Sequence, residues 1–182
     1  MSLTIQPASH TELTEILAIH RAAFPDEPVA ELTAALLLDP SAKPSLSLVA
    51  LADGRPVGHI LFTLARLFPD SSLQCALLAP LAVLPNWQRQ GIGGQLVTEG
   101  LHALAQTGVD AVFVLGHPAY YPRFGFVPAG CRGFAAPYPI PSQNAAAWMV
   151  TGLRGEPPEA PAGSTVRCAQ ALDRREYWLE PA

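Results

Sequence analysis

The spacing of apolar residues alternates between helix-like and strand-like periods along the chain. Apolar positions recur at helical spacing over residues 13–24 and 29–38, and again over 93–105. The first two segments end at the proline turns "FPDEP" and "DPSAKP". The pattern therefore predicts two helices near the N-terminus and one in the middle of the chain.

The remaining apolar runs have the length of strands. They cover residues 2–9, 45–53, 56–68, 72–85, 109–116 and 145–153. Asp53-Gly54 separates two of these runs and is a hairpin signal. Residues 117–128 predict a short aromatic turn and helix that leads into a strand. Strands and helices in this order predict a mixed α/β fold in which helices cover a sheet.

A change of composition marks the end of the expected domain. Residues 154–164, "RGEPPEAPAGS", are rich in proline and glycine and predict a linker. We therefore expect one domain over residues 1–153. Residues 154–182 are expected to form the linker and a C-terminal tail that packs on the domain or on a partner.

Composition limits the classes of partner. Only 14% of the 182 residues are charged and the net charge is −4, which argues against a phosphate-dependent nucleic-acid binder. A neutral or cationic small substrate fits this charge, and the low charge leaves a homodimer open. The three cysteines form no CxxC pair, so we expect no metal site and a reducing, cytoplasmic location. The longest apolar run, Ala76–Pro85, is too short to span a membrane, and the N-terminus has no signal-peptide pattern.

The stretch "LPNWQRQGIGGQLV" places Gly91, Gly93 and Gly94 where a helix should begin. A helix N-terminus offers unpaired N–H groups, and glycine lets a ligand approach the backbone closely. The stretch therefore predicts a phosphate cradle. A P-loop is excluded because Gln95 follows Gly94, and a Rossmann loop because Leu96 takes the place of its third glycine. The competing interpretation is a tight turn whose glycines serve packing alone.

The same stretch fills the pattern Q/R-x-x-G-x-G/A and resembles the coenzyme A pyrophosphate loop of the GCN5-related N-acetyltransferases (GNAT). A second stretch, "AYYPRFGF", places Tyr121 four residues before Gly125-Phe126, a spacing typical of that family. The resemblance covers residues 45–127 well and is closest to the YhbS-like branch of predicted N-acetyltransferases. It implies a mostly antiparallel sheet with a splayed central strand pair and helices on both faces.

The resemblance also implies acetyl-CoA as the co-substrate. Its pantetheine would pair with the backbone of the strand before the loop, at Leu81, Ala82, Val83 and Leu84. The residues implied to hold its pyrophosphate are Gln88, Arg89, Gln90, Gly91, Ile92, Gly93 and Gly94, with Arg89 and Arg123 neutralising phosphate charge.

Tyr121 is the implied general acid for the departing thiolate. A thiol has a pKa of about 8.5 and a tyrosine of about 10, so the proton transfer is uphill by only ~2 kcal/mol. The alternative is a core aromatic residue beside Tyr120, and a slip of one residue would exchange the two.

The general base is the open point of the mechanism. Many members of the family use a glutamate on the central strand, but residues 72–85 contain no carboxylate. His59 and His117 are the candidate bases, because histidine titrates in the right range. Glu31 and Asp26-Glu27 lie where the family binds its acceptor, or they are solvated surface acids. Deprotonation through water is the remaining route.

Three functions follow. The first is acetyl-CoA-dependent N-acetylation of a primary amine, on a small molecule or a protein, by direct attack on the thioester. The second is a non-catalytic CoA-binding sensor or recruiting module, which the missing carboxylate favours and Tyr121 opposes. The third is a structural α/β protein that binds no cofactor.

Overall fold

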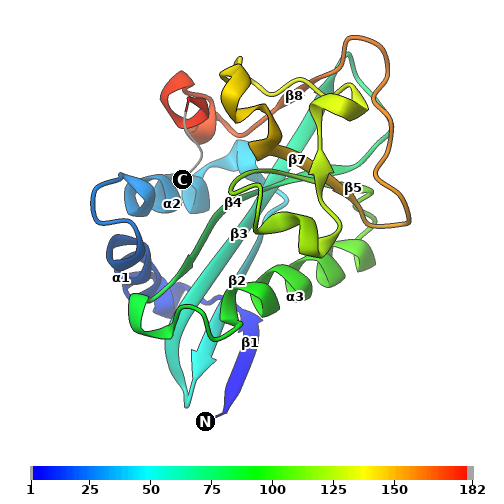
Figure 1. The fold of residues 1–182 in the computed structure, drawn as a ribbon. Coiled ribbons are helices and arrows are strands. Elements are labelled where there is room, and N and C mark those ends of the chain that lie inside the picture. The colour runs from blue at the N-terminus through cyan, green and yellow to red at the C-terminus, as the bar shows by residue number, and fades with distance from the viewer. Residues whose placement is uncertain (1, 180–182) are drawn as a thin grey trace.

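One eight-stranded sheet organises the chain in a computed structural model, which describes residues 2–179 (Figure 1). The helices are α1 (Leu13–Ala23), α2 (Val29–Leu38) and α3 (Ile92–Gln106). The strands are β1 (Leu3–Pro7), β2 (Leu46–Ala52), β3 (Arg55–Phe68), β4 (Cys75–Val83), β5 (Ala111–Leu115), β6 (Val127–Pro128), β7 (Trp148–Gly152) and β8 (Thr165–Arg167). The helices and strands expected from the sequence are confirmed.

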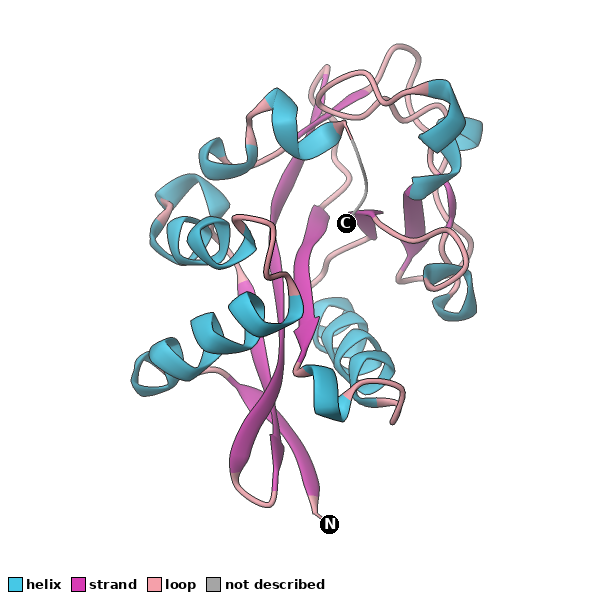
Figure 2. Cartoon of the chain, turned by 60° about the vertical axis from the view of Figure 1, so that its left-hand side comes forward, coloured by secondary structure: helices cyan, strands magenta, loops and turns pink. Residues whose placement is uncertain are grey.

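The sheet is largely antiparallel, with the order β1-β2-β3-β4-β5-β7-β6, and β8 pairs with the end of β3. Among the named strands, β4 and β5 form the one parallel pair. Figure 2 shows helices on both sides of the strands. The predicted mixed, mostly antiparallel fold is therefore confirmed.

Alternation along β3 builds two apolar cores, one on each face of the sheet. Ile60 and Phe62 face α3, whereas Leu61 belongs to the core that includes α2 residues. The α3 face packs very closely, because a Cβ on Gly58 would lie 3.1 Å from Leu96 Cδ1. Gly100 of α3 likewise leaves the space that the Phe62 ring occupies. Both glycines are therefore contact points between the helix and the sheet.

The parallel pair β4 and β5 separates partway along its length. Residues Cys75–Leu78 pair with Ala111–Val114, but β4 continues to Val83 with β3 as its remaining partner. The β3–β4 register shifts opposite this point, where Pro80 lies in the irregular segment. A proline is tolerated at a bulge because no ladder N–H is needed there. The predicted splayed central pair is thus present.

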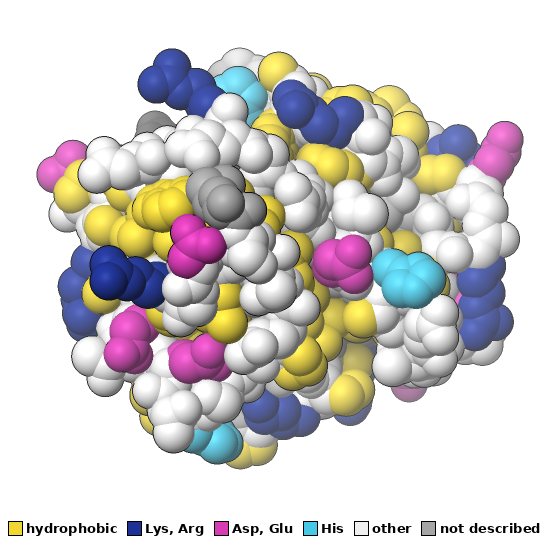
Figure 3. Space-filling model, turned by 90° about the horizontal axis from the view of Figure 1, so that it is seen from below, with side chains coloured by type: hydrophobic (Ala, Val, Ile, Leu, Met, Phe, Trp, Pro, Cys, Tyr) yellow, Lys and Arg dark blue, Asp and Glu magenta, His cyan; other side chains and the backbone are white. Residues whose placement is uncertain are grey.

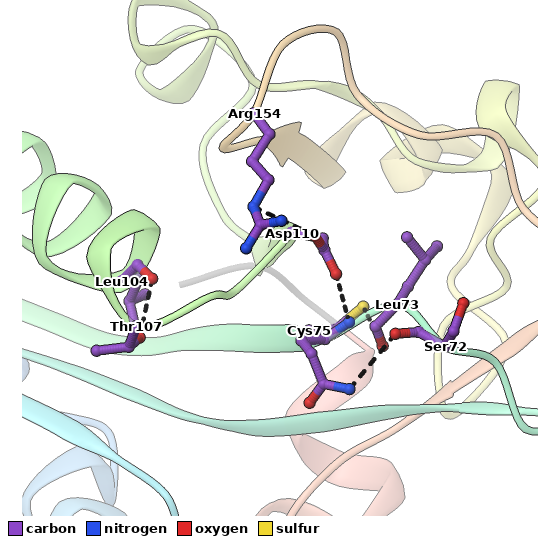
Figure 4. A network of polar contacts seen from close by, with 8 residues as sticks. Ser72, Leu73, Cys75, Leu104, Thr107, Asp110 and Arg154 are labelled. Atoms are coloured by element: carbon purple, nitrogen blue, oxygen red, sulfur yellow. Dashed lines mark hydrogen bonds and ion pairs between the residues drawn. The ribbon is translucent and has the colours of Figure 1, made fainter.

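Asp110 fixes the closed end of the split (Figure 4). Its carboxylate accepts a hydrogen bond from the Gln74 N–H at 2.8 Å and lies 3.5 Å from the Arg154 guanidinium. Its backbone C=O accepts from the Leu153 N–H at 2.8 Å. These contacts join the starts of β4 and β5 to the end of β7. The strands are therefore tied together at one end and free to diverge at the other.

The C-terminal segment returns to the domain and packs beside α2. Trp178 is buried with its ring 5.7 Å from that of Trp148. Asp39, which ends α2, accepts a hydrogen bond from the Ala171 N–H at 2.9 Å, and Ser41 Oγ accepts from the Gln170 N–H at 2.8 Å. Burial would raise the pKa of Asp39, but the hydrogen bonds from Ser41 and Ala171 outweigh it and hold the pKa below its usual value.

Charged side chains are scattered on the face seen in Figure 3, with both signs interspersed. This agrees with the low charged fraction of the sequence. Within residues 2–179, no helix has the length and apolar character needed to cross a bilayer.

Gly100→Ala is expected to destabilise the protein by about 1–3 kcal/mol, because the added Cβ would overlap the Phe62 ring in a packed core. Urea unfolding of the two proteins measures the difference. Gly130→Ala is the matched control, since a Cβ there meets no atom within 4 Å, and it should change stability by less than about 0.5 kcal/mol. Equal stabilities of the Gly100 and Gly130 variants would contradict this packing.

Candidate functional site

The three glycines between β4 and α3 have three different physical roles. Gly91 caps the helix with φ 85°, a left-handed conformation that favours glycine. Gly93 leaves room for the Tyr120 hydroxyl, which would lie 2.8 Å from a Cβ at that position. Gly94 faces the Phe124 ring, 3.5 Å from a Cβ placed there. The loop is therefore shaped both by its backbone and by the aromatic segment that follows β5.

The start of α3 presents unpaired backbone donors. Gln95 is the first residue whose N–H closes a helical turn, on the Gly91 carbonyl at 3.0 Å. The N–H groups of Ile92, Gly93 and Gly94 precede that bond and have no acceptor within the helix. The positive end of the helix dipole adds to their attraction for an anion.

These donors open into a cleft of about 540 Å³, which we call the loop cleft. Its lining residues are Leu81, Val83, Trp87, Gln88, Arg89, Gly91, Ile92, Gly93, Gly94, Tyr120, Arg123 and Phe124. The Arg123 Nε donates to the Tyr120 carbonyl at 2.9 Å and its guanidinium lies 4.8 Å from the Tyr120 ring centre. Two arginines and a helix N-terminus make this cleft suited to a phosphate-bearing ligand.

Glutamine side chains brace the loop. Gln88 Nε2 donates to the Val83 carbonyl at 3.0 Å, and Gln90 Nε2 donates to the Asn86 carbonyl at 3.1 Å. Gln90 is not among the residues that line the loop cleft. We therefore assign it a positioning role, since its amide ties the loop to itself.

The unpaired half of β4 directs alternate backbone groups into the gap. The Leu84 N–H donates to the Val57 carbonyl at 2.9 Å, and Ala82 lies opposite His59. In an antiparallel ladder the hydrogen-bonded residues alternate, so Ala82 and Leu84 point their backbone toward β3. Leu81 and Val83 point theirs toward the gap. This divides the four residues expected to pair with a ligand into two that face it and two that do not.

A second cleft of about 530 Å³ lies beyond the diverging ends of β4 and β5, and we call it the strand-end cleft. Leu81 and Tyr120 line both clefts, so the two adjoin at the gap. The lining is Phe24, Glu27, Pro28, Val29, Leu32, Leu77, Leu78, Ala79, Pro80, Leu81, Val114, Leu115, Gly116, His117, Tyr120, Tyr121, Leu172, Glu176, Tyr177 and Trp178.

The two neighbouring tyrosines occupy different places at this junction. Tyr121 lines the strand-end cleft but not the loop cleft. Its ring fills the space beside Gly116, where a Cβ would overlap it. Burial raises the pKa of Tyr121, and the neighbouring Tyr120 adds to the effect. Tyr120 reaches back to Gly93 and the loop. Although they are adjacent in sequence, Tyr121 therefore lies at the strand ends and Tyr120 at the start of α3.

The two candidate histidines lie in contrasting environments. His117 is exposed and lines the strand-end cleft. His59 is fully buried and lines neither cleft; its Nδ1 lies 2.8 Å from His20 Nε2 and its Nε2 lies 2.9 Å from Ser47 Oγ. The structure therefore brings His117, but not His59, to the site.

The acidic candidates also differ in whether they reach the site. Glu27, between α1 and α2, lines the strand-end cleft, whereas Glu31 lies 3.7 Å from Arg21 on the surface and Asp26 lines neither cleft. The sequence reasoning missed Glu176, Tyr177 and Trp178, which form one wall of that cleft. The aromatic pair in "REYWLE" was the available signal, since large aromatic residues in a tail usually pack against something.

Comparisons with known proteins agree with this geometry. The profile of the acetyltransferase (GNAT) family matches residues 12–126. The chain is 45% identical over 157 residues to YjhQ of Escherichia coli strain K12, an uncharacterized N-acetyltransferase, covering 85% of this chain and 86% of that protein. The crystal structure of Escherichia coli YhbS in complex with CoA superposes with a TM-score of 0.79 at 29% identity, covering 94% of this chain and 92% of that one. A GNAT family acetyltransferase from Brucella melitensis in complex with acetyl-CoA gives a TM-score of 0.74 at 29% identity, covering 94% and 99% of the two chains.

The buried histidine pair should make stability depend on pH. Burial lowers the pKa of His20 to about 4 and that of His59, with the nearby His20 contributing, to about 3. The unfolded chain therefore binds protons from about pH 6.5 downward while the folded chain does not, so stability falls as the pH drops from 6.5 toward 4. Each histidine contributes up to about 1.4 kcal/mol per pH unit.

Thermal melting at several pH values measures this slope. Replacing both residues, His20→Leu with His59→Leu, should flatten it. The exposed His102→Gln variant is the control and should keep it. A double variant with an unchanged slope would show that other groups govern the acid sensitivity.

Proposed function

This chain belongs to the GNAT acetyltransferase family, and we propose that it transfers the acetyl group of acetyl-CoA to a primary amine by direct attack on the thioester. The enzyme class, an acetyl-CoA-dependent N-acetyltransferase, follows from the family. The observation that carries the direct route is the junction of the two clefts at Leu81 and Tyr120. A donor in one cleft and an acceptor in the other would meet there.

The loop cleft supplies the cofactor site in this proposal. The pyrophosphate would bind the N–H groups of Ile92, Gly93 and Gly94, with Arg89 and Arg123 nearby. Hydrogen bonds to a charged group contribute about 1.5–3 kcal/mol each, so a few of them account for much of a micromolar affinity. The pantetheine would extend along the unpaired half of β4, pairing with the backbone of Leu81 and Val83.

The gap also offers a group to stabilise the transition state. The Leu81 N–H faces the gap at the point where the clefts meet. We propose that it donates a hydrogen bond to the thioester carbonyl as negative charge develops on the oxygen. Such preorganised donors are commonly worth about 3 kcal/mol in a catalytic site.

Tyr121 is the proposed general acid for the thiolate that leaves. Its pKa is raised by burial, which by itself would make proton donation harder. Desolvation in the same cleft would raise the pKa of the departing CoA thiol as well. Since desolvation acts on both partners, the transfer stays close to balanced. The phenol therefore remains a workable acid.

The acceptor amine must lose a proton before it attacks the thioester, so a base within reach of the strand-end cleft is needed. His117 lines the strand-end cleft and is preferred to His59, whose two ring nitrogens contact His20 and Ser47 in the core. Glu27 and Glu176 line the same cleft and can act directly or through water. We propose His117 as the first candidate because it lies two residues after the end of β5 and four residues before Tyr121.

The alternative function is a CoA-binding module without turnover. One observation favours it: β4 carries no carboxylate anywhere between Cys75 and Val83. It shares the cofactor site with the enzyme and differs in predicting no transfer to any amine. We further propose a cytoplasmic location, because the cysteines at 75, 131 and 168 are all free thiols. A homodimer is compatible with the low surface charge.

Gly91→Glu should abolish acetyl-CoA binding, because it places a side chain and a negative charge at the phosphate site. We expect at least a 100-fold loss of affinity by calorimetric titration, about 2.7 kcal/mol. Gly54→Glu is the matched control: Gly54 has φ 80° against 85° for Gly91, and a Cβ meets no atom within 4 Å at either. It should bind as the wild type does. Equal affinities of the two variants for acetyl-CoA would show that the loop at Gly91 does not bind the cofactor.

Tyr121→Phe should lower kcat by about 100-fold or more with little change in acetyl-CoA affinity, because it removes a proton donor while keeping the ring. Tyr120→Phe is the comparison and should leave kcat within about 5-fold, since its hydroxyl lies beside Gly93. Steady-state release of CoA measures both. The reverse ranking would transfer the acid role to Tyr120.

A further inference from the structure

The charged side chains of the strand-end cleft are of one sign. Glu27 and Glu176 line it, and no lysine or arginine does among the described residues. The loop cleft is the opposite, with Arg89 and Arg123 in its lining. The two halves of the site are therefore suited to ligands of opposite charge.

We propose that the acceptor is a small amine with an apolar or aromatic body, a positive charge and no carboxylate, and that Glu27 and Glu176 select it. This inference rests on the proposed function and names the substrate class of that same site. It also assigns a specificity role to the C-terminal segment, which contributes Glu176 to the lining of the strand-end cleft.

The dimensions and walls of the cleft favour a small apolar body. A volume of about 530 Å³ is in the range of small-molecule pockets. Phe24, Leu32, Leu77 and Trp178 contribute apolar or aromatic surface to its walls. Such walls stabilise an alkyl chain or ring through burial and give no hydrogen bonds to a carboxylate or sugar.

The two glutamates are free to meet a cation. Both are exposed, and within residues 2–179 neither takes part in an ion pair. Tyr121 and Leu77, which line the same cleft, are buried. The negative charge therefore lies toward the solvent side, where it attracts an ammonium and repels a carboxylate on the way in.

Both glutamates are held in place by segments with defined contacts. The Glu27 N–H donates to the Phe24 carbonyl at 3.3 Å. Glu176 lies in a short helical turn beside the buried Trp178, whose Nε1 donates to the Leu172 carbonyl at 3.1 Å. Asp39 and Ser41 fix the chain just before this turn. Two segments far apart in the sequence thus bring like charges to one cleft.

Matched pairs of acceptors test the selectivity on the full chain. Tyramine and L-tyrosine differ by one carboxylate, as do phenethylamine and L-phenylalanine. With saturating acetyl-CoA, we expect kcat/KM for each amine to exceed that for its amino acid by at least about 10-fold. A lysine-containing peptide should be acetylated more slowly than either amine.

Variants that remove the negative charge test whether Glu27 and Glu176 bind the acceptor. Glu27→Gln and Glu176→Gln should each raise KM for tyramine by about 3- to 5-fold, and the double variant by about 10-fold or more, with KM for acetyl-CoA unchanged. Glu99→Gln on the exposed face of α3 is the matched control and should change neither constant. Glu176→Lys should narrow the preference of the enzyme for tyramine over L-tyrosine.

The outcomes separate this inference from the proposed function. If the protein binds acetyl-CoA but acetylates the amino acids or the peptide as efficiently as the amines, the inferred substrate class is wrong and the proposed enzymatic function still stands. Acetyl-CoA binding without acetylation of any amine tested would also overturn it, and would favour the CoA-binding module. An unchanged KM for tyramine in both Gln variants would show that Glu27 and Glu176 do not select the acceptor. No binding of acetyl-CoA would overturn the proposed function itself.

Discussion

The early end of the pairing between β4 and β5 is the constraint on which the rest of the site depends. The strands are joined as far as Leu78 and Val114 and then diverge, while Asp110 ties their starts together. The backbone N–H groups of Leu81 and Val83 and the Leu81 carbonyl are left facing a gap, whereas the Val83 carbonyl accepts a hydrogen bond from Gln88 Nε2. An unpaired backbone group is costly unless water or a ligand satisfies it, so the split is both a local defect of the sheet and a place for an extended ligand.

Close packing on the α3 face turns this split into a positioned site. Gly58 and Gly100 let the helix approach β3, which sets the height of its N-terminus above the sheet. Tyr120 then fits against Gly93, and Tyr121 against Gly116. These four glycines thus allow contacts that a Cβ would crowd, and together they position the loop before α3 and the aromatic segment after β5 around the gap.

Much of this was predictable from the sequence, because the signals are local. The spacing of apolar residues located the helices and strands, and the glycine pattern located the turn between β4 and α3. The remainder depends on contacts between distant segments. The burial of His59 follows from its pairing with His20, 39 residues away, and the place of Glu176 follows from bonds between residues 39–41 and 170–171. The aromatic pair at 177–178 indicates that the tail packs against something, but neither contact partner can be read from the sequence. The backbone alternation that separates Leu81 from Ala82 needs the register with β3, which one sequence does not give.

The C-terminal segment divides the two recognition tasks between separate stretches of the chain. Residues 81–94 and 120–124 surround the loop cleft, whereas one wall of the strand-end cleft comes from residues 172–178. Between β8 and residue 179 this segment contributes no strand to the sheet. Exchanging the exposed Glu176 or the half-buried Tyr177, with the buried Leu172 and Trp178 kept, would therefore change this wall while leaving the loop cleft and the core strands intact. Under the proposed function, the donor site and this acceptor wall are built by separate stretches of the chain, and residues 176 and 177 are the natural place to begin re-engineering the acceptor selectivity.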